Sequence, residues 1–273
     1  MRALPAVLLL AFAFGMAPTR SLAQETTPPG WLGITLDGAA AQLRAALGDP
    51  VRITRLPEAL AGSGIQATPD MQPERKARYV LSFTKPLFLI VSERHGAVVG
   101  IEVLSDQPLA AELVEIAPDP SGIVLGATDD AVLKAHPDAH RMQDEYGARL
   151  FAVLGRRYIA AYGLAGGRVR SITWFARAGT DPPVEGPALS EPAGDSPATA
   201  ILDLAKTETD GILWERIWSD SHPCDGTNRW VKGTVATSHA NGRVYDAIRY
   251  TCPSTGATRT VYFDITAFFG KFG

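Results

Sequence analysis

A run of proline and glycine interrupts the chain over residues 179–197. Eight of these nineteen residues are Pro or Gly, and neither residue type sustains an ordinary helix or a central strand. We therefore predict a semi-rigid linker, partly polyproline II, at residues 179–197. This linker separates a long N-terminal part from a C-terminal domain at residues 198–273, in keeping with about two domains for 273 residues.

The first 23 residues have the pattern of a secretory signal. A positive charge at Arg2 precedes an apolar stretch from Leu4 to Met16, and the small residues Ser21 and Ala23 occupy the −3 and −1 positions of a cleavage site. The apolar stretch is shorter than the roughly 20 residues that a membrane-spanning helix needs. We expect cleavage near Ala23, no membrane span afterwards, and a periplasmic or secreted protein of a bacterial cell envelope.

Composition and charge narrow the classes of partner. Hydrophobic residues make up 46% of the chain and charged residues 20%, which is typical of a globular protein and not of a disordered one. Lys and Arg number 26 against 29 Asp and Glu, so the formal net charge is −3. Because no basic excess is present, we expect neither nucleic acid nor an anionic membrane as a partner.

The N-terminal part has the pattern of a tandem repeat. Residues 31–36 align with residues 120–125, and residues 96–103 align with residues 167–174, through shared small and apolar positions. We predict two helix-plus-antiparallel-meander modules, at residues 31–105 and 117–178. The first pair of segments is separated by 89 residues and the second pair by 71. The first module is therefore longer by 18 residues between these segments, and we place the extra residues as an insertion at 57–75.

Each module begins with a short helix and continues as strands. In the first, Leu36, Ala40, Leu43 and Leu47 recur at helical spacing before a stop at Gly48. In the second, we predict a helix over 128–135 that is capped by its first residue, a threonine. Strands are expected at 79–83, 87–91 and 98–103 in the first module, and at 149–154, 158–162 and 169–175 in the second.

Two short motifs in these modules resemble known families. They are Gly-x-Thr-x-x-x-Val at residues 126–132 and Leu-Gly-Asp-Pro at residues 47–50. They resemble the helix-plus-meander module of the outer-membrane assembly lipoproteins, and two such modules in tandem resemble the β-lactamase inhibitor protein family. The chain lacks the lipidated cysteine of the former and has no cysteine in either module, unlike the latter. The resemblance implies protein binding.

The C-terminal domain is predicted to be α+β, with a helix packed on an antiparallel sheet. Pro197 is suited to the first position of a helix that we place at 198–208. Strands are expected around Val231 to Val235, Val244 to Tyr250 and Val261 to Ile265, with a two-residue hairpin turn at Asn241-Gly242. Residues 212–218 alternate in a way that is also typical of a strand. The whole chain is thus expected to be α+β.

The two cysteines both lie in the C-terminal domain. Centring the hairpin on Asn241-Gly242 places Cys252 opposite about Val231, and Cys224 lies in the loop just before that strand. We predict a Cys224–Cys252 disulfide, because two unpaired thiols are unusual in an exported protein. The alternative is a nucleophilic Cys224 beside His222.

The remaining candidate residues point to binding more than to catalysis. His136 and His140 have the i, i+4 spacing of metal ligands, but Pro137 lies between them, so no metal site is predicted. No phosphate loop, dinucleotide fingerprint or nucleophile elbow occurs, and no cofactor is expected. Aromatic residues of the C-terminal domain form a candidate binding surface or, alternatively, the core of that domain: Trp214, Trp218, Trp230, Tyr245 and Tyr250.

These observations favour a non-catalytic protein that binds another envelope or secreted protein. Two alternatives remain at this point. One is a small-ligand carrier that uses the C-terminal sheet and its aromatic residues as a pocket. The other is a secreted hydrolase that uses Asp220 or Asp225 together with His222. The sequence sets no oligomeric state.

Overall fold

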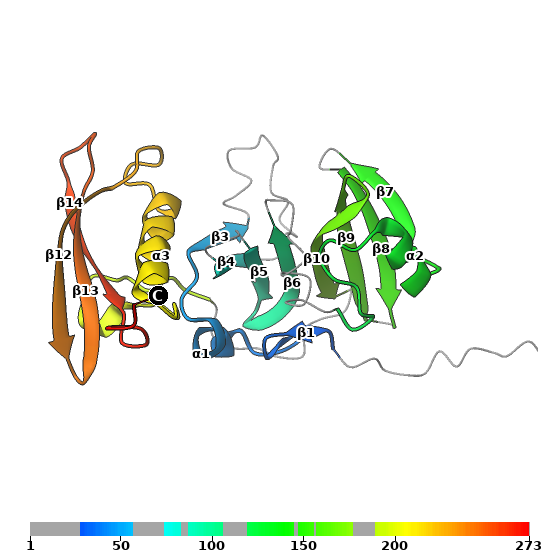
Figure 1. Ribbon diagram of the computed structural model, residues 1–273, viewed down its shortest axis with the longest axis horizontal. Helices are drawn as coiled ribbons and strands as arrows, with labels where there is room; N and C mark the ends of the chain where they lie inside the picture. Colours follow the sequence, from blue (N-terminus) through cyan, green and yellow to red (C-terminus); the bar gives the residue numbers. More distant parts are fainter. Residues whose placement is uncertain are drawn as a thin grey trace, which may run out of the picture.

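The computed structural model contains two large β-sheets, which lie side by side along the long axis of the molecule (Figure 1). It describes residues 28–56, 74–82, 87–105, 119–144, 147–155, 157–176 and 189–272. The export signal at 1–23, the insertion residues 57–73, Phe83 and the first part of the linker at 179–188 lie outside this range. The predicted α+β fold is confirmed. Among the described residues, no helix is long and apolar enough to cross a lipid bilayer.

An eight-stranded antiparallel sheet forms the N-terminal domain. Its strand order is β3-β4-β5-β6-β10-β9-β8-β7. A small two-stranded sheet precedes it, formed by β1 (Gly30–Trp31) and β2 (Ile34–Thr35). The eight strands are β3 (Arg52–Leu56), β4 (Glu74–Ser82), β5 (Leu87–Arg94), β6 (Ala97–Ser105), β7 (His140–Asp144), β8 (Gly147–Leu154), β9 (Tyr158–Ala165) and β10 (Arg168–Ala176).

Each half of this sheet is a four-stranded meander that follows a short helix. The meanders meet in the middle, where β6 pairs with β10 and Ile101 lies opposite Trp174. Both side chains are fully buried. The sequence predicted three strands for each half, and the structure adds β3 and β7 at the two outer edges. The pairing of β6 with β10 makes one sheet out of both halves.

The short helices cover one face of the eight-stranded sheet. A 3-10 turn at Ala40–Gln42 continues into α1 (Leu43–Leu47), and Leu36, Ala40 and Leu43 are each 1% exposed. Helix α2 (Asp129–Ala135) begins after Thr128, whose side chain accepts a hydrogen bond from the amide of Ala131. This is the predicted N-cap, and it satisfies a backbone donor that would otherwise lack a partner.

The C-terminal domain packs one long helix on a four-stranded sheet with the order β11-β14-β13-β12. Its elements are β11 (Ile201–Leu202), α3 (Glu208–Ser221), β12 (Val231–Ala240), β13 (Arg243–Thr251) and β14 (Thr258–Asp264). The hairpin turn is at Asn241-Gly242, where both residues have the positive φ that this turn needs.

The predicted helix at 198–208 is wrong. Only Pro197–Thr199 form a single 3-10 turn, and Ile201–Leu202 then pair in parallel with β14. Ile201 is fully buried, so its burial in the sheet outweighs local helix propensity. The helix begins instead after Thr207, whose side chain accepts the amide hydrogen of Asp210.

The alternation over residues 212–218, which is compatible with a strand, belongs to a helix. These residues belong to α3, and Trp214 and Trp218 are four residues apart on the helix face that packs against the sheet. Their rings meet Phe263 of β14 edge to face, at centroid distances of 5.7 and 5.5 Å. The spacing of four between the two tryptophans was the signal of the helix.

The second part of the predicted linker is fixed against both domains. Glu191 accepts a hydrogen bond from the amide of Ile53 in β3 at 2.6 Å, and Leu189 donates to Glu93 of β5 at 3.3 Å. On the other side, the amide of Tyr262 in β14 donates to the carbonyl of Gly194 at 2.7 Å. Residues 189–194 therefore form a strap from one sheet to the other.

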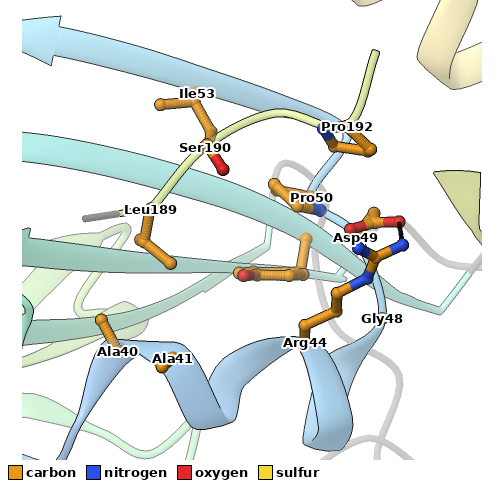
Figure 2. A pocket seen from close by; sticks show the side chains of 11 residues that line it. Ala40, Ala41, Arg44, Gly48, Asp49, Pro50, Ile53, Leu189, Ser190 and Pro192 are labelled. Carbon is orange, nitrogen blue, oxygen red and sulfur yellow. Dashed lines mark hydrogen bonds and ion pairs between the residues drawn. The ribbon is translucent and has the colours of Figure 1, made fainter. Parts of the chain in front are cut away.

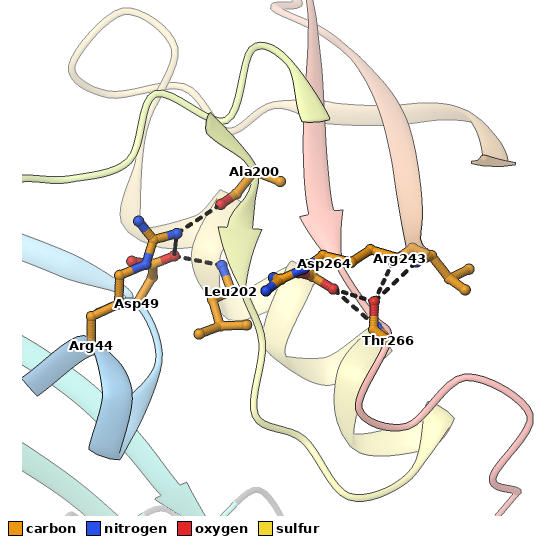
Figure 3. Close-up of polar contacts among 8 residues, drawn as sticks. Arg44, Asp49, Ala200, Leu202, Arg243, Asp264 and Thr266 are labelled. Atoms are coloured by element: carbon orange, nitrogen blue, oxygen red, sulfur yellow. Dashed lines mark hydrogen bonds and ion pairs between the residues drawn. The ribbon is translucent and has the colours of Figure 1, made fainter. Parts of the chain in front are cut away.

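A direct polar contact joins the two domains beside this strap (Figure 3). The carboxylate of Asp49 accepts the amide hydrogen of Leu202 at 2.5 Å, while the amide of Asp49 donates to the carbonyl of Leu202 at 3.1 Å. Arg44 of α1 donates from Nη2 to Asp49 and to the carbonyl of Ala200, both at 3.1 Å. Val51 packs into the apolar core of the C-terminal domain.

Candidate functional site

The face of the eight-stranded sheet opposite the helices is the candidate binding surface, and we call it the open face. Side chains alternate between the two faces of a strand. Along β5, Leu87, Leu89 and Val91 are fully buried, whereas the intervening Phe88 and Ile90 are half-buried. The run of apolar residues at 87–91 thus reflects a strand with apolar side chains on both faces.

Large apolar side chains gather on the open face from both halves of the sheet. They are Phe88 and Ile90 of β5, Leu104 of β6, Phe151 and Val153 of β8, Ile159 of β9, Phe175 of β10 and Met142 of β7. Val153 and Met142 are 59% and 58% exposed. A sheet face that only had to meet water would carry polar side chains at these positions.

The middle of the open face carries small residues. A side chain at Gly163 would place its Cβ 2.4 Å from the hydroxyl of Ser171, and one at Gly100 would lie 3.1 Å from Cβ of Ser92. Glycine at these two positions keeps neighbouring strands free of protruding side chains. The same central strands also carry Leu104 of β6 and Phe175 of β10, so apolar side chains are present across the face from β5 to β8.

The open face has an excess of positive charge. Among the side chains that the structure describes, its basic ones are Arg52, Lys76, Arg78, Arg94 and Arg149, and its carboxylates are Glu74 and Glu102. The guanidinium of Arg78 lies 3.8 Å from the ring centroid of Phe88, a cation–π contact. The face is thus apolar and basic, although the chain as a whole has a net charge of −3.

Glu102 is the acidic group at the centre of this face. Burial raises the pKa of its carboxyl group, while Lys76, Arg149 and a hydrogen bond with Thr173 oppose that rise. Three neighbours from three different strands thus converge on one carboxylate. Desolvation is the largest of these effects, so binding of a further apolar surface over Glu102 would favour its neutral form.

The aromatic residues predicted as a binding surface form the core of the C-terminal domain instead. Trp214, Trp218, Tyr245 and Tyr250 are between 1% and 5% exposed, and Trp230 packs against the same core. The prediction of a surface at these residues is therefore wrong. Trp214, Trp218 and Tyr250 face inward because a small domain with one helix and one sheet needs large side chains to fill the space between them, whereas Tyr245 is buried on the other face of β13.

The cysteines form a disulfide, as predicted. Cys224 and Cys252 are joined across 28 residues of sequence, and neither is a free thiol. Thiol nucleophilic chemistry at Cys224 is thereby excluded in this structure. The bond is typical of proteins that reside in an oxidising compartment, such as secreted proteins.

The residues of the hydrolase hypothesis are not brought together. Nδ1 of His222 lies 2.7 Å from the carbonyl oxygen of Trp218, and its Nε2 lies 3.7 Å from a carboxylate oxygen of Glu191. Asp220 pairs instead with Arg229 at 3.4 Å. The Asp225 carboxylate accepts hydrogen bonds from Asn228 and Ser254, which hold its pKa low. The geometry gives His222 a structural role between α3 and the strap.

His136 and His140 do not share a helix face. His136 ends α2, whereas His140 begins β7. Nε2 of His136 lies 2.7 Å from the hydroxyl of Ser121 and 2.9 Å from that of Tyr162, and the Tyr162 hydroxyl also donates to buried Asp119. Burial lowers the pKa of His136, with Asp119 opposing. This polar network ties α2 to β9, and sequence reasoning missed it.

Comparison with known proteins gives few relatives. No protein-family model matches the chain, and neither does any curated protein. Two solved structures are similar in part. An extracellular protein containing a SCP domain from Bacillus anthracis str. Ames has 12% identity and a TM-score of 0.32, over 56% of this chain and 48% of that chain. A cysteine-rich secretory protein from Staphylococcus aureus subsp. aureus Mu50 has 9% identity and a TM-score of 0.30, over 60% of this chain and 53% of that chain. This chain spans about half the length of each, and neither likeness assigns it to a family.

Proposed function

We propose that the chain is an exported, non-catalytic protein that binds another protein of the cell envelope through the open face of its eight-stranded sheet. The observation that carries this proposal is the cluster of large apolar side chains on that face, contributed by both halves of the sheet. Apolar surface of this kind on an otherwise polar protein marks an interaction site. The resemblance of the two modules to the β-lactamase inhibitor protein family and to outer-membrane assembly lipoproteins supports the same function.

The charge of the open face sets the chemistry of the partner. The basic side chains on this face favour a protein surface that carries Asp and Glu around an apolar centre. A nucleic acid partner is disfavoured, because the chain has no overall basic excess. Since rim charges act mainly on association and are screened by salt, added salt should weaken the complex without abolishing it.

We expect Val153→Asp to weaken binding of the partner by about 100-fold, because it introduces an unpaired charge into the apolar patch. Val153 is 59% exposed on β8, so the substitution should leave the fold intact. The matched control is Val235→Asp on β12 of the other sheet, where the valine is 46% exposed and the affinity should be unchanged.

This experiment begins with an extract of the native cell envelope. Proteins retained by the wild-type chain and by Val235→Asp, but not by Val153→Asp, are identified, purified and titrated calorimetrically against all three chains. Equal affinity of the purified partner for wild type and Val153→Asp would contradict the proposal. Retention of no protein by the wild-type chain would contradict it equally.

Export itself is tested by the N-terminus of the native protein. We expect the first residue of the purified protein to be Gln24. Cleavage after Ala23 places the small residues Ser21 and Ala23 at the −3 and −1 positions, as signal peptidase cleavage sites require. Intact-mass measurement of protein recovered from the envelope fraction checks this. A protein that retains Met1 and fractionates with the cytoplasm would be incompatible with an envelope function.

A further inference from the structure

A cavity of about 200 Å³ lies at the junction of the two domains, beside the strap (Figure 2). Its walls come from α1, from the start of β3, from β4 and from residues 189–192 of the strap. The apolar part of the lining is Ala40, Ala41, Pro50, Ile53, Leu189 and Pro192. The polar part consists of Arg44, Asp49, Tyr79 and Ser190. An apolar wall with a few polar groups is the usual composition of a small-molecule site.

The hydroxyl of Tyr79 has no hydrogen-bond partner among the described residues, although its side chain is only 3% exposed. Burial and the nearby Asp49 carboxylate raise the pKa of this phenol, so it remains a neutral hydrogen-bond donor. Tyr79 is among the residues that line the cavity. The hydroxyl is therefore available to a bound molecule.

The charged end of the cavity offers one cation and one anion. Arg44 uses Nη2 for Asp49 and for Ala200, and its Nε and Nη1 have no partner within the described part of the chain. Its side chain remains 57% exposed. Asp49 uses Oδ2 for Arg44 and Leu202, and its Oδ1 likewise makes no hydrogen bond to a described residue. A ligand can thus meet a free donor and a free acceptor at the same end.

This pairing selects the charge of the ligand. A simple carboxylate would be attracted by Arg44 but repelled by Asp49. A simple amine would be attracted by Asp49 but repelled by Arg44. A zwitterion satisfies both groups, with its carboxylate at Arg44 and its ammonium at Asp49. The volume sets the size of the apolar part: a cavity of about 150 Å³ accommodates benzene, so this one has room for a side chain such as that of leucine or phenylalanine.

We propose that the junction cavity binds a free apolar α-amino acid. Its carboxylate accepts hydrogen bonds from Arg44 and Tyr79, its ammonium group donates to Asp49, and its side chain contacts Ile53, Leu189 and Pro192. Because the walls belong to both the N-terminal domain and the strap, the bound amino acid stabilises the junction. This site is separate from the open face, and its existence does not depend on the protein partner.

The test is calorimetric titration of the mature protein with L-leucine and L-phenylalanine at millimolar concentration. The matched probes are 4-methylpentanoate, which lacks the ammonium group of leucine, and 3-methylbutylamine, which lacks the carboxylate. We expect at least one of the two amino acids to bind about ten-fold more tightly than either probe. No heat from either amino acid, or equal affinity for 4-methylpentanoate and leucine, would overturn the proposal.

Two variants locate the site. Arg44→Gln should weaken amino acid binding by about ten-fold, whereas Arg249→Gln, at an exposed arginine of β13 outside the cavity, should not. Because Arg44 also contacts Ala200, a second variant leaves the polar contacts intact: Ala41→Leu fills the cavity from an exposed position of the 3-10 turn before α1. Unchanged affinity in Ala41→Leu, with native chemical shifts elsewhere, would place the bound amino acid outside this cavity.

Discussion

Replacement of both cysteines by serine is expected to lower the free energy of unfolding of the C-terminal domain by about 3 to 4 kcal/mol. The disulfide closes a loop with a sequence separation of 28, and the chain-entropy relation gives this range for a loop of that length. The domain has a single helix on four strands, so its core is small and a covalent link contributes a large share of its stability. Urea unfolding of the Cys224→Ser/Cys252→Ser variant measures the loss.

The bond also orders the loops on either side of it. Cys224 donates its amide hydrogen to the carbonyl of Asn228 at 2.9 Å, and Ser254 donates its hydroxyl to Asp225, which links the two loops a second time. Reduction of the wild-type chain should therefore reproduce the loss seen in the double variant, and the reductant should not affect the variant itself. A loss of less than about 1 kcal/mol would show that the non-covalent contacts of these loops suffice.

Substitution of Asp203 by Asn is expected to remove a loss of stability at high pH. The free energy of unfolding of the variant minus that of wild type should be about 4 kcal/mol larger at pH 8 than at pH 5. Asp203 is fully buried, and burial raises the pKa of its carboxyl group to about 8, with Glu215 and Asp210 adding to the rise. Its Oδ1 accepts a hydrogen bond from the amide of Ala205, whereas Oδ2 has no partner. The neutral acid is therefore the form that the fold tolerates.

The sign of this pH dependence follows from proton binding. In the unfolded chain the carboxyl group of Asp203 is ionised above about pH 4, whereas in the folded protein it keeps its proton up to about pH 8. The folded state binds more protons in this window, so stability falls as the pH rises, by about 1.4 kcal/mol per unit. Three units, from pH 5 to pH 8, correspond to about 4 kcal/mol.

Chemical unfolding of wild type and Asp203→Asn at several pH values measures this difference. Other carboxylates whose pKa is raised by burial are present in both proteins, and subtraction removes their contributions except that of Glu215, whose charge acts on Asp203 directly. Asp130→Asn, at an exposed carboxylate of α2, is the control and should leave the pH profile as in wild type. Parallel profiles for wild type and Asp203→Asn would mean that the Asp203 carboxyl group ionises in the folded protein near its ordinary pKa.

Local features of the fold were accessible from the sequence because they depend on neighbouring residues. The Thr128 cap and the turn at Asn241-Gly242 each need only a few adjacent residues to form. The disulfide could be predicted because the hairpin register brings Cys252 close to the start of β12, where Val231 pairs with Thr251. The register of one hairpin, set by its own turn, was enough to predict this disulfide.

The helix of the C-terminal domain was misplaced because a distant strand decided its position. Residues 201–202 pair with β14, about sixty residues later in the chain. No local pattern indicates that partner, so the local sequence alone predicts a helix for this segment. The helix signal lay instead in Thr207, Trp214 and Trp218, where a cap precedes two aromatic residues at a spacing of four.

The candidate sites depended on tertiary structure in the same way. The sequence indicated meanders and aromatic residues, but only the pairing of β6 with β10 joins the apolar side chains of both halves on one open face. Only the docking of the strap against α1 and β3 forms the junction cavity.

The sequence by itself therefore determined the α+β class, the caps, the hairpin and the cysteine pair. Periodicity shows that a strand or helix has a buried side, but it does not show what covers that side. The tertiary structure decided that the tryptophans of α3 fill a core, that the described short helices cover one face of the eight-stranded sheet, and that Arg44 and Asp49 meet at a cavity. Each of these depends on contacts between residues far apart in the chain, which sequence spacing does not specify.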